Sequence, residues 1–192
     1  MSSGVRVTPR AAVFLDRDGT IVQDRKYLAD PAGLSIITGV PEALVRLRDA
    51  GLPLIVVTNQ SGIGRGFFTE EMFATITTHL DAMLLEHGVT FVATYHCPDA
   101  PDVPDAISCR KPGDKMHLRA ALEHDIDLKR SFFVGDMWRD VAPAVTHGAM
   151  GVLVPTSDTP FRDLAKASYD AVVATTMDAA VDRILRMFTQ RS

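Results

Sequence analysis

The chain has 192 residues, of which 46% are hydrophobic and 23% charged, values ordinary for a soluble globular protein with a sizeable core. Its net charge of −4 gives no electrostatic reason to expect nucleic acid or an anionic membrane as a partner. No apolar stretch approaches the roughly 20 residues of a membrane span, and two cysteines are too few for a disulfide framework. We therefore expect a single domain over residues 1–192, monomeric and located in the reducing cytoplasm.

Short apolar runs alternate with helical patterns along the chain. In chain order, the prediction is strand 11–15, helix 41–51, strand 52–58, helix 70–84, strand 89–95, helix 114–124, strand 131–135, helix 138–147, strand 149–154, strand 170–174 and helix 177–189. Continuous apolar runs of this length are typical of strands buried on both faces. The alternation predicts an α/β fold, with a doubly wound, mainly parallel Rossmann-like sheet and helices on both faces.

Polar side chains gather where these strands end, and ligands of such sheets bind beyond the carboxyl ends of the strands. These side chains are Asp16 and Asp18 after the first strand, Thr58 and Asn59 after the second, Arg110 and Lys111 after the third, and Asp136 and Asp140 after the fourth. Carboxylates at close range repel one another, so we expect a hard divalent cation such as Mg²⁺ among them. Lys111, Arg110, Thr58 and the Asn59 amide are suitable donors to a tetrahedral anion. The pattern predicts a phosphate bound across a metal.

Four sequence segments, FLDRDGTI, VVTNQSGIGRGFF, CRKP and VGD, occur in this order at the predicted strand ends. Together they resemble the motifs of the haloacid dehalogenase-like phosphatases, and most of all the heptose-bisphosphate branch, which is related to the histidinol-phosphate phosphatases. The resemblance implies a Mg²⁺-dependent phosphatase that acts on a small phosphorylated sugar, with D-glycero-D-manno-heptose 1,7-bisphosphate at C7 as the leading substrate. Histidinol phosphate or another sugar phosphate is the alternative. A phosphotransferase or a non-catalytic relative is the alternative of a different class.

The resemblance also implies a role for each residue. Asp16 would be the nucleophile that forms an aspartyl-phosphate, and Asp18 would be the general acid and base. Thr58 and Lys111 would hold the transferring oxygens. The ligands of Mg²⁺ would be the Asp16 carboxylate, the Asp18 backbone carbonyl and the Asp136 carboxylate, with Asp140 behind them.

Many members of this superfamily carry a cap domain that closes over the site. In this chain the interval between Asp18 and Thr58 and the interval between Tyr95 and Lys111 are too short for one. We therefore expect no cap domain and an open site, with selectivity supplied by loops that include an insertion at about 96–112. The candidate substrate-binding residues are Asp24, Arg25, Lys26, Tyr27, Asn59, Gln60, Ser61 and Arg110. Of these, Arg110 is placed to reach a second phosphate or a substrate hydroxyl, and the alternative is a surface arginine that pairs with the aspartates of its loop.

The insertion departs from the pattern of the heptose branch, in which C-x-H and C-x-C pairs commonly bind zinc. Here Ile107 stands where one of the cysteines would be. The candidate zinc ligands are Cys97, Cys109, His96 and Asp99, whereas structural zinc usually takes four N or S ligands. The alternative is a metal-free loop with two free cysteines. A Cys97–Cys109 disulfide is geometrically feasible but disfavoured in a reducing cytosol.

Overall fold

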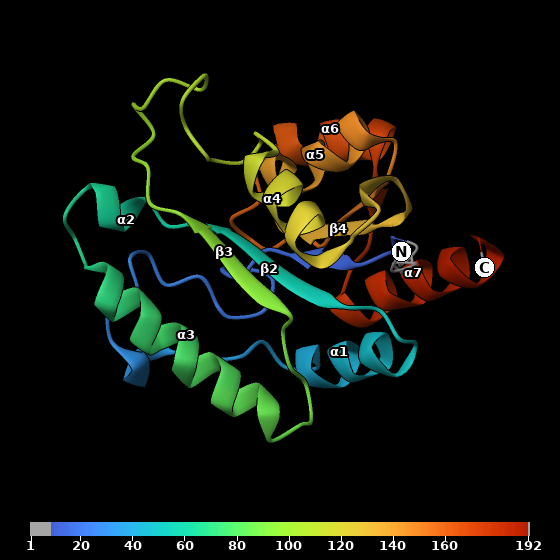
Figure 1. The fold of residues 1–192 in the computed structure, drawn as a ribbon, viewed down its shortest axis with the longest axis horizontal. Helices are drawn as coiled ribbons and strands as arrows, with labels where there is room; N and C mark the ends of the chain where they lie inside the picture. The colour runs from blue at the N-terminus through green and yellow to red at the C-terminus, as the bar shows by residue number, and fades with distance from the viewer. Residues whose placement is uncertain (1–8, 192) are drawn as a thin grey trace, which may run out of the picture.

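Six parallel strands form one sheet in the order β3-β2-β1-β4-β5-β6 (Figure 1). The computed structural model describes residues 9–191, so residues 1–8 and 192 of the predicted domain lie outside the description. The strands are β1 (Val13–Leu15), β2 (Leu54–Asn59), β3 (Ala93–Cys97), β4 (Phe132–Gly135), β5 (Met150–Leu153) and β6 (Val172–Val173). β1, the first of these strands, lies inside the sheet, and the later strands are added on both sides of it, which confirms the doubly wound α/β fold.

Helices cover both faces of this sheet. They are α1 (Val40–Asp49), α2 (Ser61–Gly64), α3 (Glu70–Leu85), α4 (Lys115–His124), α5 (Trp138–His147), α6 (Phe161–Asp170) and α7 (Met177–Arg191), with 3-10 turns at Pro31–Gly33 and Leu128–Arg130. In Figure 1, α1, α3 and α7 lie on one side of the sheet, and α4, α5 and α6 lie on the other. Over residues 9–191, every helix is too short or too polar to cross a membrane.

The strands alternate their side chains between two apolar layers. Val13 and Leu15 of β1 face the larger layer, where they meet side chains of α1, α3 and α7, such as Leu44 and Ile184. Phe14, between them in sequence, faces the second layer, which includes residues of α4 and α5. Both faces of the central strands are therefore buried, which explains why their sequences are continuously apolar.

Several parts of the fold differ from the sequence-based prediction, among them the short helix α2, which was not predicted. Helix α6 was not predicted, because only Ala167 of its residues is fully buried and no stripe of large apolar residues marks it. Strand β3 begins at Ala93, four residues after the predicted start, because Val89 still closes the end of α3 through a bond from its N–H to the Leu84 carbonyl. The shift brings His96 and Cys97 into the sheet, where Cys97 lies opposite Asn59.

β1 and β4 are parallel neighbours, and on either side of this pair the later strands are added in opposite directions across the sheet. Asp16 follows β1 and Asp136 follows β4, and the N–H of Asp16 donates to the Val134 carbonyl at 2.9 Å. Ligands of doubly wound sheets bind at this kind of switch point, beyond the carboxyl ends of the strands. The fold thus places the predicted acids where such a sheet is open to a ligand.

Replacing Phe133 by Ala should lower the free energy of unfolding by about 3–5 kcal/mol, because its fully buried ring leaves a cavity between the sheet and the second layer. The measurement is urea unfolding. Phe161→Ala is the matched control, since that ring is 84% exposed and its loss should change stability by less than about 0.5 kcal/mol. Equal effects of the two substitutions would contradict this packing.

Candidate active site

Lys111 lies at the centre of a buried cluster of charged side chains. Its Nζ is 2.6 Å from Asp16 Oδ1 and 2.8 Å from Asp140 Oδ1, and it donates to the Val57 carbonyl at 2.6 Å. Carboxylate oxygens of Asp16, Asp136 and Asp140 all lie within 4.8 Å of one another. The sequence positions of these residues are far apart, and the strand ends bring them together as expected.

One ammonium group does not balance three buried carboxylates. Burial, opposed by Lys111 and reinforced by Asp140 and Asp18, raises the pKa of Asp16 to about 7. Burial together with the charges of Asp16 and Asp140 raises the pKa of Asp136 to about 8. The pKa of Lys111 is raised because the two carboxylates outweigh the effect of its burial. The cluster therefore has room for further positive charge.

The structure around Asp136 fits a bound cation. Oδ1 of Asp136 is buried and accepts no hydrogen bond within residues 9–191, which would be costly unless another group satisfied it. The Asp16 and Asp136 carboxylates and the Asp18 carbonyl are hard oxygen donors of the kind that Mg²⁺ takes. The residues present are thus compatible with a divalent cation in this position.

Two glycines let the backbone approach these acids. A Cβ added at Gly19 would lie 2.5 Å from Asp136 Oδ2, and the residue has a φ of +81° that L side chains rarely adopt. A Cβ at Gly135 would lie 2.2 Å from the Cβ of Asp140. The glycines of DGT and VGD are therefore required by the close packing around the carboxylates.

Asp136 and Asp140 are held in place by hydrogen bonds from two other residues. The Asp140 carboxylate accepts a hydrogen bond from the Met137 N–H at 3.0 Å, as in a capping box, and so is fixed at the first turn of the helix. Thr159, from the loop after β5, donates its hydroxyl to the Asp136 carbonyl at 2.8 Å. Sequence reasoning missed Thr159, because no local motif marks it.

Gln60 connects two of the predicted catalytic residues. Its Nε2 donates to Thr58 Oγ1 and to Asp18 Oδ2, both at 2.8 Å. The Asp18 carboxylate also accepts bonds from Nε and Nη2 of Arg17 at 2.9–3.1 Å, and Arg17 is buried against the Phe73 ring. Asp18 is thus oriented from two sides, and Arg17 is a second residue that the sequence prediction left out although it lies inside the DRD motif.

The side chain of Asn59, which was expected to bind the anion, is hydrogen-bonded to the backbone of Lys111. Its Nδ2 donates to the Lys111 carbonyl at 3.1 Å, and its Oδ1 accepts from the Lys111 N–H at 3.0 Å. A carboxamide matches the donor and acceptor of a peptide unit, so both polar ends of the side chain are used. Asn59 therefore positions the backbone that carries the Lys111 ammonium.

A pocket of about 280 Å³ opens beside the acids, just below the usual range for small-molecule sites. Every predicted substrate-binding residue lines it, together with residues that the prediction did not include. The lining residues are Arg17, Asp18, Asp24, Arg25, Lys26, Tyr27, Leu28, Asn59, Gln60, Ser61, Gly62, Phe68, Arg110 and Arg139. Asp16, Thr58, Lys111 and Asp136 lie deeper and are at most 6% exposed.

Two loops meet at the mouth of this pocket. Arg65 Nη1 donates to the Tyr27 hydroxyl at 3.0 Å, and the Tyr27 ring packs edge-on against Phe67 with 4.6 Å between ring centroids. Tyr27 has a φ of 60°, a strained value for an aromatic residue that the contacts with the second loop offset. The ring is therefore held in one place at the rim.

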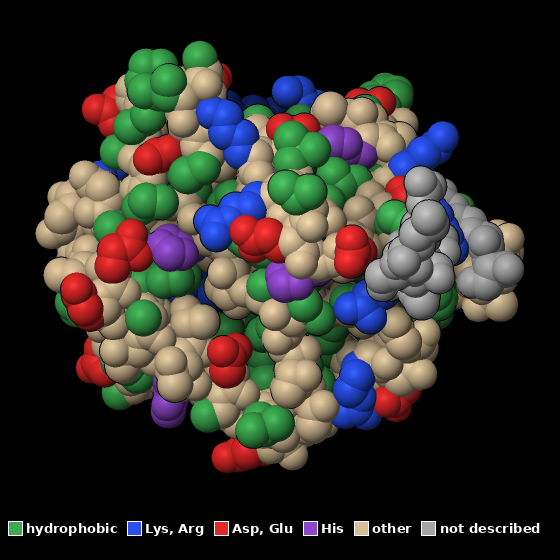
Figure 2. Space-filling model, viewed as in Figure 1, with side chains coloured by type: hydrophobic (Ala, Val, Ile, Leu, Met, Phe, Trp, Pro, Cys, Tyr) green, Lys and Arg blue, Asp and Glu red, His purple; other side chains and the backbone are tan. Residues whose placement is uncertain are grey.

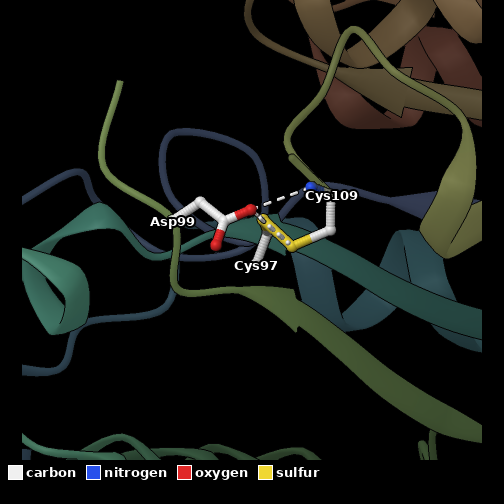
Figure 3. A group of neighbouring side chains, drawn as sticks. All are labelled: Cys97, Asp99 and Cys109. Carbon is white, nitrogen blue, oxygen red and sulfur yellow. Dashed lines mark hydrogen bonds between the residues drawn. A yellow bond between two sulfur atoms is a disulfide. The ribbon is translucent and has the colours of Figure 1, made fainter. Parts of the chain in front are cut away.

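The loop after β3 is closed by a disulfide between Cys97 and Cys109 (Figure 3). Asp99 organises the same loop: its Oδ2 accepts from the Cys109 N–H at 2.9 Å and from the Ser108 hydroxyl at 3.0 Å. Its carbonyl accepts from Arg110 Nη1 at 2.8 Å. The expectation of two free cysteines is wrong in this structure, because β3 extends to Cys97 and so brings it to the point where the loop returns.

The predicted zinc site is not assembled in this structure. Cys97, Asp99 and Cys109 do cluster within 4.8 Å, but both sulfurs are used in the disulfide and are not thiolates. His96 points elsewhere: its Nε2 lies 2.7 Å from Glu70 Oε2, and its ring packs on Phe73. In a strand, neighbouring side chains face opposite sides of the sheet, so His96 and Cys97 do not converge on one metal.

The surface over β3, α3 and α4 carries acidic and basic side chains interspersed with one another (Figure 2). This mixture agrees with the small net charge of the chain. A face of this kind offers no single-sign field for a polyanion. The concentrated charge of the molecule is instead found inside, at the ends of β1 and β4.

Comparison with known proteins agrees with this site. Residues 108–180 match the family model described as "HAD-hyrolase-like". The D-glycero-beta-D-manno-heptose-1,7-bisphosphate 7-phosphatase of Yersinia pestis is 36% identical over 172 residues, which cover 87% of this chain and 92% of that protein. The enzyme of the same name from Photorhabdus laumondii is 43% identical over 138 residues, which cover 69% of this chain and 73% of that protein.

Two solved structures have a fold similar to that of this chain. The D,D-heptose 1,7-bisphosphate phosphatase of B. bronchiseptica, complexed with magnesium and phosphate, superposes with a TM-score of 0.80 at 29% identity, covering 92% of this chain and 98% of that one. A putative HAD-like phosphatase from Mesorhizobium loti superposes with a TM-score of 0.77 at 31% identity, covering 98% of this chain and 91% of that one.

Reducing the Cys97–Cys109 bond with a thiol should lower the free energy of unfolding by about 3 kcal/mol, the chain-entropy value for a loop closed over this 12-residue separation. The measurement is urea unfolding with and without dithiothreitol. The double variant Cys97→Ser/Cys109→Ser is the control, because its stability should not respond to the reductant. A wild-type protein as insensitive as this variant would show that the bond does not form.

Proposed function

This chain belongs to the haloacid dehalogenase-like hydrolases, in the family of the heptose 1,7-bisphosphate 7-phosphatases, and from this membership we propose that it removes the C7 phosphate of D-glycero-D-manno-heptose 1,7-bisphosphate. The chain is a phosphoric monoester hydrolase. The observation that carries the proposal is the buried contact of Lys111 with Asp16, beside Asp136 and behind a pocket lined by arginines. The cytoplasmic location and the monomeric state stay predictions.

Asp16 is the proposed nucleophile. Its carboxylate attacks phosphorus, the ester oxygen leaves, and an aspartyl-phosphate forms that water later hydrolyses. Lys111 keeps the attacking group oriented through the 2.6 Å contact to Oδ1, and its charge offsets the negative charge that collects on the transferring oxygens. The Thr58 hydroxyl, oriented by Gln60, is the proposed neutral donor to the same oxygens.

Asp18 is the proposed general acid and base. Asp18 lines the pocket, whereas Asp16 lies deeper. The Asp18 carboxyl group is therefore on the side from which the leaving oxygen departs. It protonates that oxygen in the first step and takes a proton from the attacking water in the second. Arg17 and Gln60 fix the direction of the carboxylate for both transfers.

Mg²⁺ is the proposed cofactor, held by the Asp16 carboxylate, the Asp18 carbonyl and the Asp136 carboxylate. The unsatisfied Oδ1 of Asp136 and the raised pKa values of Asp16 and Asp136 support a cation in this place. When bound, the metal would neutralise charge on the phosphoryl group. Asp140 stays with Lys111 and the start of α5, and Thr159 supports Asp136 from behind.

The pocket favours a sugar carrying two phosphates. Asp16 lies behind the lining residues, whereas the rest of a substrate would contact the loops around Asp24–Leu28, Asn59–Gly62 and Arg110. Without a cap domain, these loops supply the selectivity. Histidinol phosphate carries one phosphate, so it has no second phosphate to contact the basic side chains of the lining, and it is the second candidate.

The purified protein should release phosphate from heptose 1,7-bisphosphate, in the presence of Mg²⁺, with a kcat/KM at least about tenfold above that for histidinol phosphate. The physical reason is that only the bisphosphate makes charge-assisted contacts to the basic lining of the pocket. The measurement is phosphate release over a panel of sugar and amino-alcohol phosphates. Equal values for the two substrates would favour the second candidate.

Asp16→Asn is the control for this panel. The amide keeps the shape of the side chain but is not a nucleophile, so turnover should be lost for every substrate while the circular dichroism spectrum stays unchanged. A folded Asp16→Asn protein that releases phosphate at a near-normal rate would exclude Asp16 as the attacking group.

The affinity for Mg²⁺ should rise with pH, by about tenfold per unit for each proton displaced, and level off above the pKa of about 8 of Asp136. Below this pKa the carboxyl group is protonated and the cation must displace the proton, so binding weakens as the pH falls. The measurement is calorimetric titration of Mg²⁺ at pH 6, 7, 8 and 9. Asp136→Asn should bind weakly at every pH, and a wild-type affinity independent of pH would contradict the assignment.

A further inference from the structure

Arg17 holds the carboxylate of Asp18 along one edge of its guanidinium group. Nε and Nη2 donate to the two carboxylate oxygens at 2.9–3.1 Å. The remaining nitrogen, Nη1, is buried and makes no hydrogen bond within residues 9–191. A planar guanidinium can be hydrogen-bonded at its edge and packed on its face at the same time. Because Nη1 lacks a partner, the direction of this group depends on Asp18 and on what packs against its face.

The ring of Phe73, in α3, supplies this packing. Cζ of Arg17 lies over the Phe73 ring, 5.2 Å from its centroid. A guanidinium group in this position is attracted by the electron-rich face of the ring, most strongly where water is excluded. Arg17 and Phe73 are 3% and 5% exposed, so the contact is buried. The guanidinium is therefore held at its edge by a carboxylate and on its face by an aromatic ring.

The burial of Phe73 is not explained by the apolar layers of the fold. Leu80 and Leu84 of the same helix belong to the larger layer, whereas Phe73 is part of neither layer within residues 9–191. The ring instead contacts the side chains of Arg17 and His96. A buried aromatic side chain with such neighbours orients them as well as filling space.

The Phe73 ring is itself held from β3. His96 packs on it with 4.2 Å between the ring centroids, and His96 Nε2 lies 2.7 Å from Glu70 Oε2. Glu70 and Phe73 are three residues apart in α3, so they lie on the same face of the helix. One side chain of β3 therefore contacts both of them and fixes the first turn of α3 beside Arg17.

We propose that Phe73 is a positioning residue for the general acid and base Asp18, and that it acts through Arg17. The proposal rests on the proposed function, because it concerns the step in which Asp18 protonates the leaving oxygen. That transfer needs a hydrogen bond of the right geometry, and so a fixed direction of the carboxyl group. Gln60 contacts one oxygen of this group, whereas Arg17 contacts both and sets its plane.

The test compares Phe73→Leu with the wild type, as full-length proteins with Mg²⁺, on two esters. Heptose 1,7-bisphosphate releases an alkoxide and needs its leaving oxygen protonated, whereas p-nitrophenyl phosphate releases a weak base and needs this far less. The kcat/KM, which covers the steps up to loss of the leaving group, should fall about 10- to 100-fold for the sugar ester and less than about threefold for the aryl ester. A purely structural role would not change the ratio of the two values.

Leu80→Val is the matched control, because Leu80 is buried on the same helix but packs in the larger layer. It should leave the ratio unchanged. Arg17→Lys keeps the charge but not the planar fork, and it should cause the same selective loss. Adding Phe73→Leu to Arg17→Lys should then cost little more, because Phe73 acts through the guanidinium. Equal losses on both esters, or independent effects of the two substitutions, would overturn the proposal.

The Arg17 Nε–H signal in a proton–nitrogen NMR spectrum reports the same contact without turnover. Phe73→Leu should shift and broaden this signal, whereas Leu80→Val should leave it in place. An unchanged signal and an unchanged ester ratio in Phe73→Leu would reject the role of Phe73 and leave the phosphatase chemistry in place. A changed signal, with no phosphate released from either ester by the wild type, would reject the proposed reaction and leave the contact of Phe73 with Arg17 in place. The two failures are therefore distinguishable.

Discussion

The buried ammonium group of Lys111 between Asp16 and Asp140 is the contact on which the rest of the site depends. Lys111 links Asp16, which follows β1, to Asp140 in the first turn of α5. Asn59, at the end of β2, holds the backbone of Lys111 through two hydrogen bonds. A buried ion pair contributes little net stability, whereas an unpartnered buried charge is costly. The contact therefore serves mainly to orient the Lys111, Asp16 and Asp140 side chains. It does not neutralise all of the buried carboxylates, and the pKa values of Asp16 and Asp136 are raised.

Chemistry and selectivity are carried by different parts of the structure. The reacting groups sit directly at the ends of β1, β2 and β4 or are bonded to them, so their positions follow from the register of the sheet. The pocket lining comes mostly from the loops after β1, β2 and β3. Strand ends are rigid and loops are adaptable, which is why a doubly wound fold can keep one reaction and change its substrate.

Much of this could be predicted from the sequence, because buried parallel strands have continuous apolar runs and their ends must share one edge. The acids and Lys111 were found in this way, and so were some of the pocket residues, but others, such as Arg17 and Arg139, were not. What could not be predicted depends on side-chain direction and exact register. Asn59 turned to the Lys111 backbone and His96 turned to Glu70, and a shift of β3 brought Cys97 to Cys109. Helix α6 lacked a large apolar stripe, and Thr159 reaches Asp136 only in three dimensions.

The disulfide has a consequence for how the chain can vary. Cys109 immediately precedes Arg110 and Lys111, so the covalent link to β3 sets where these two cations begin, independently of the path taken by the residues between the cysteines. Loop length alters closure entropy only slowly. Insertions, deletions and new side chains between Asp99 and Ser108 should therefore be tolerated without displacing Lys111.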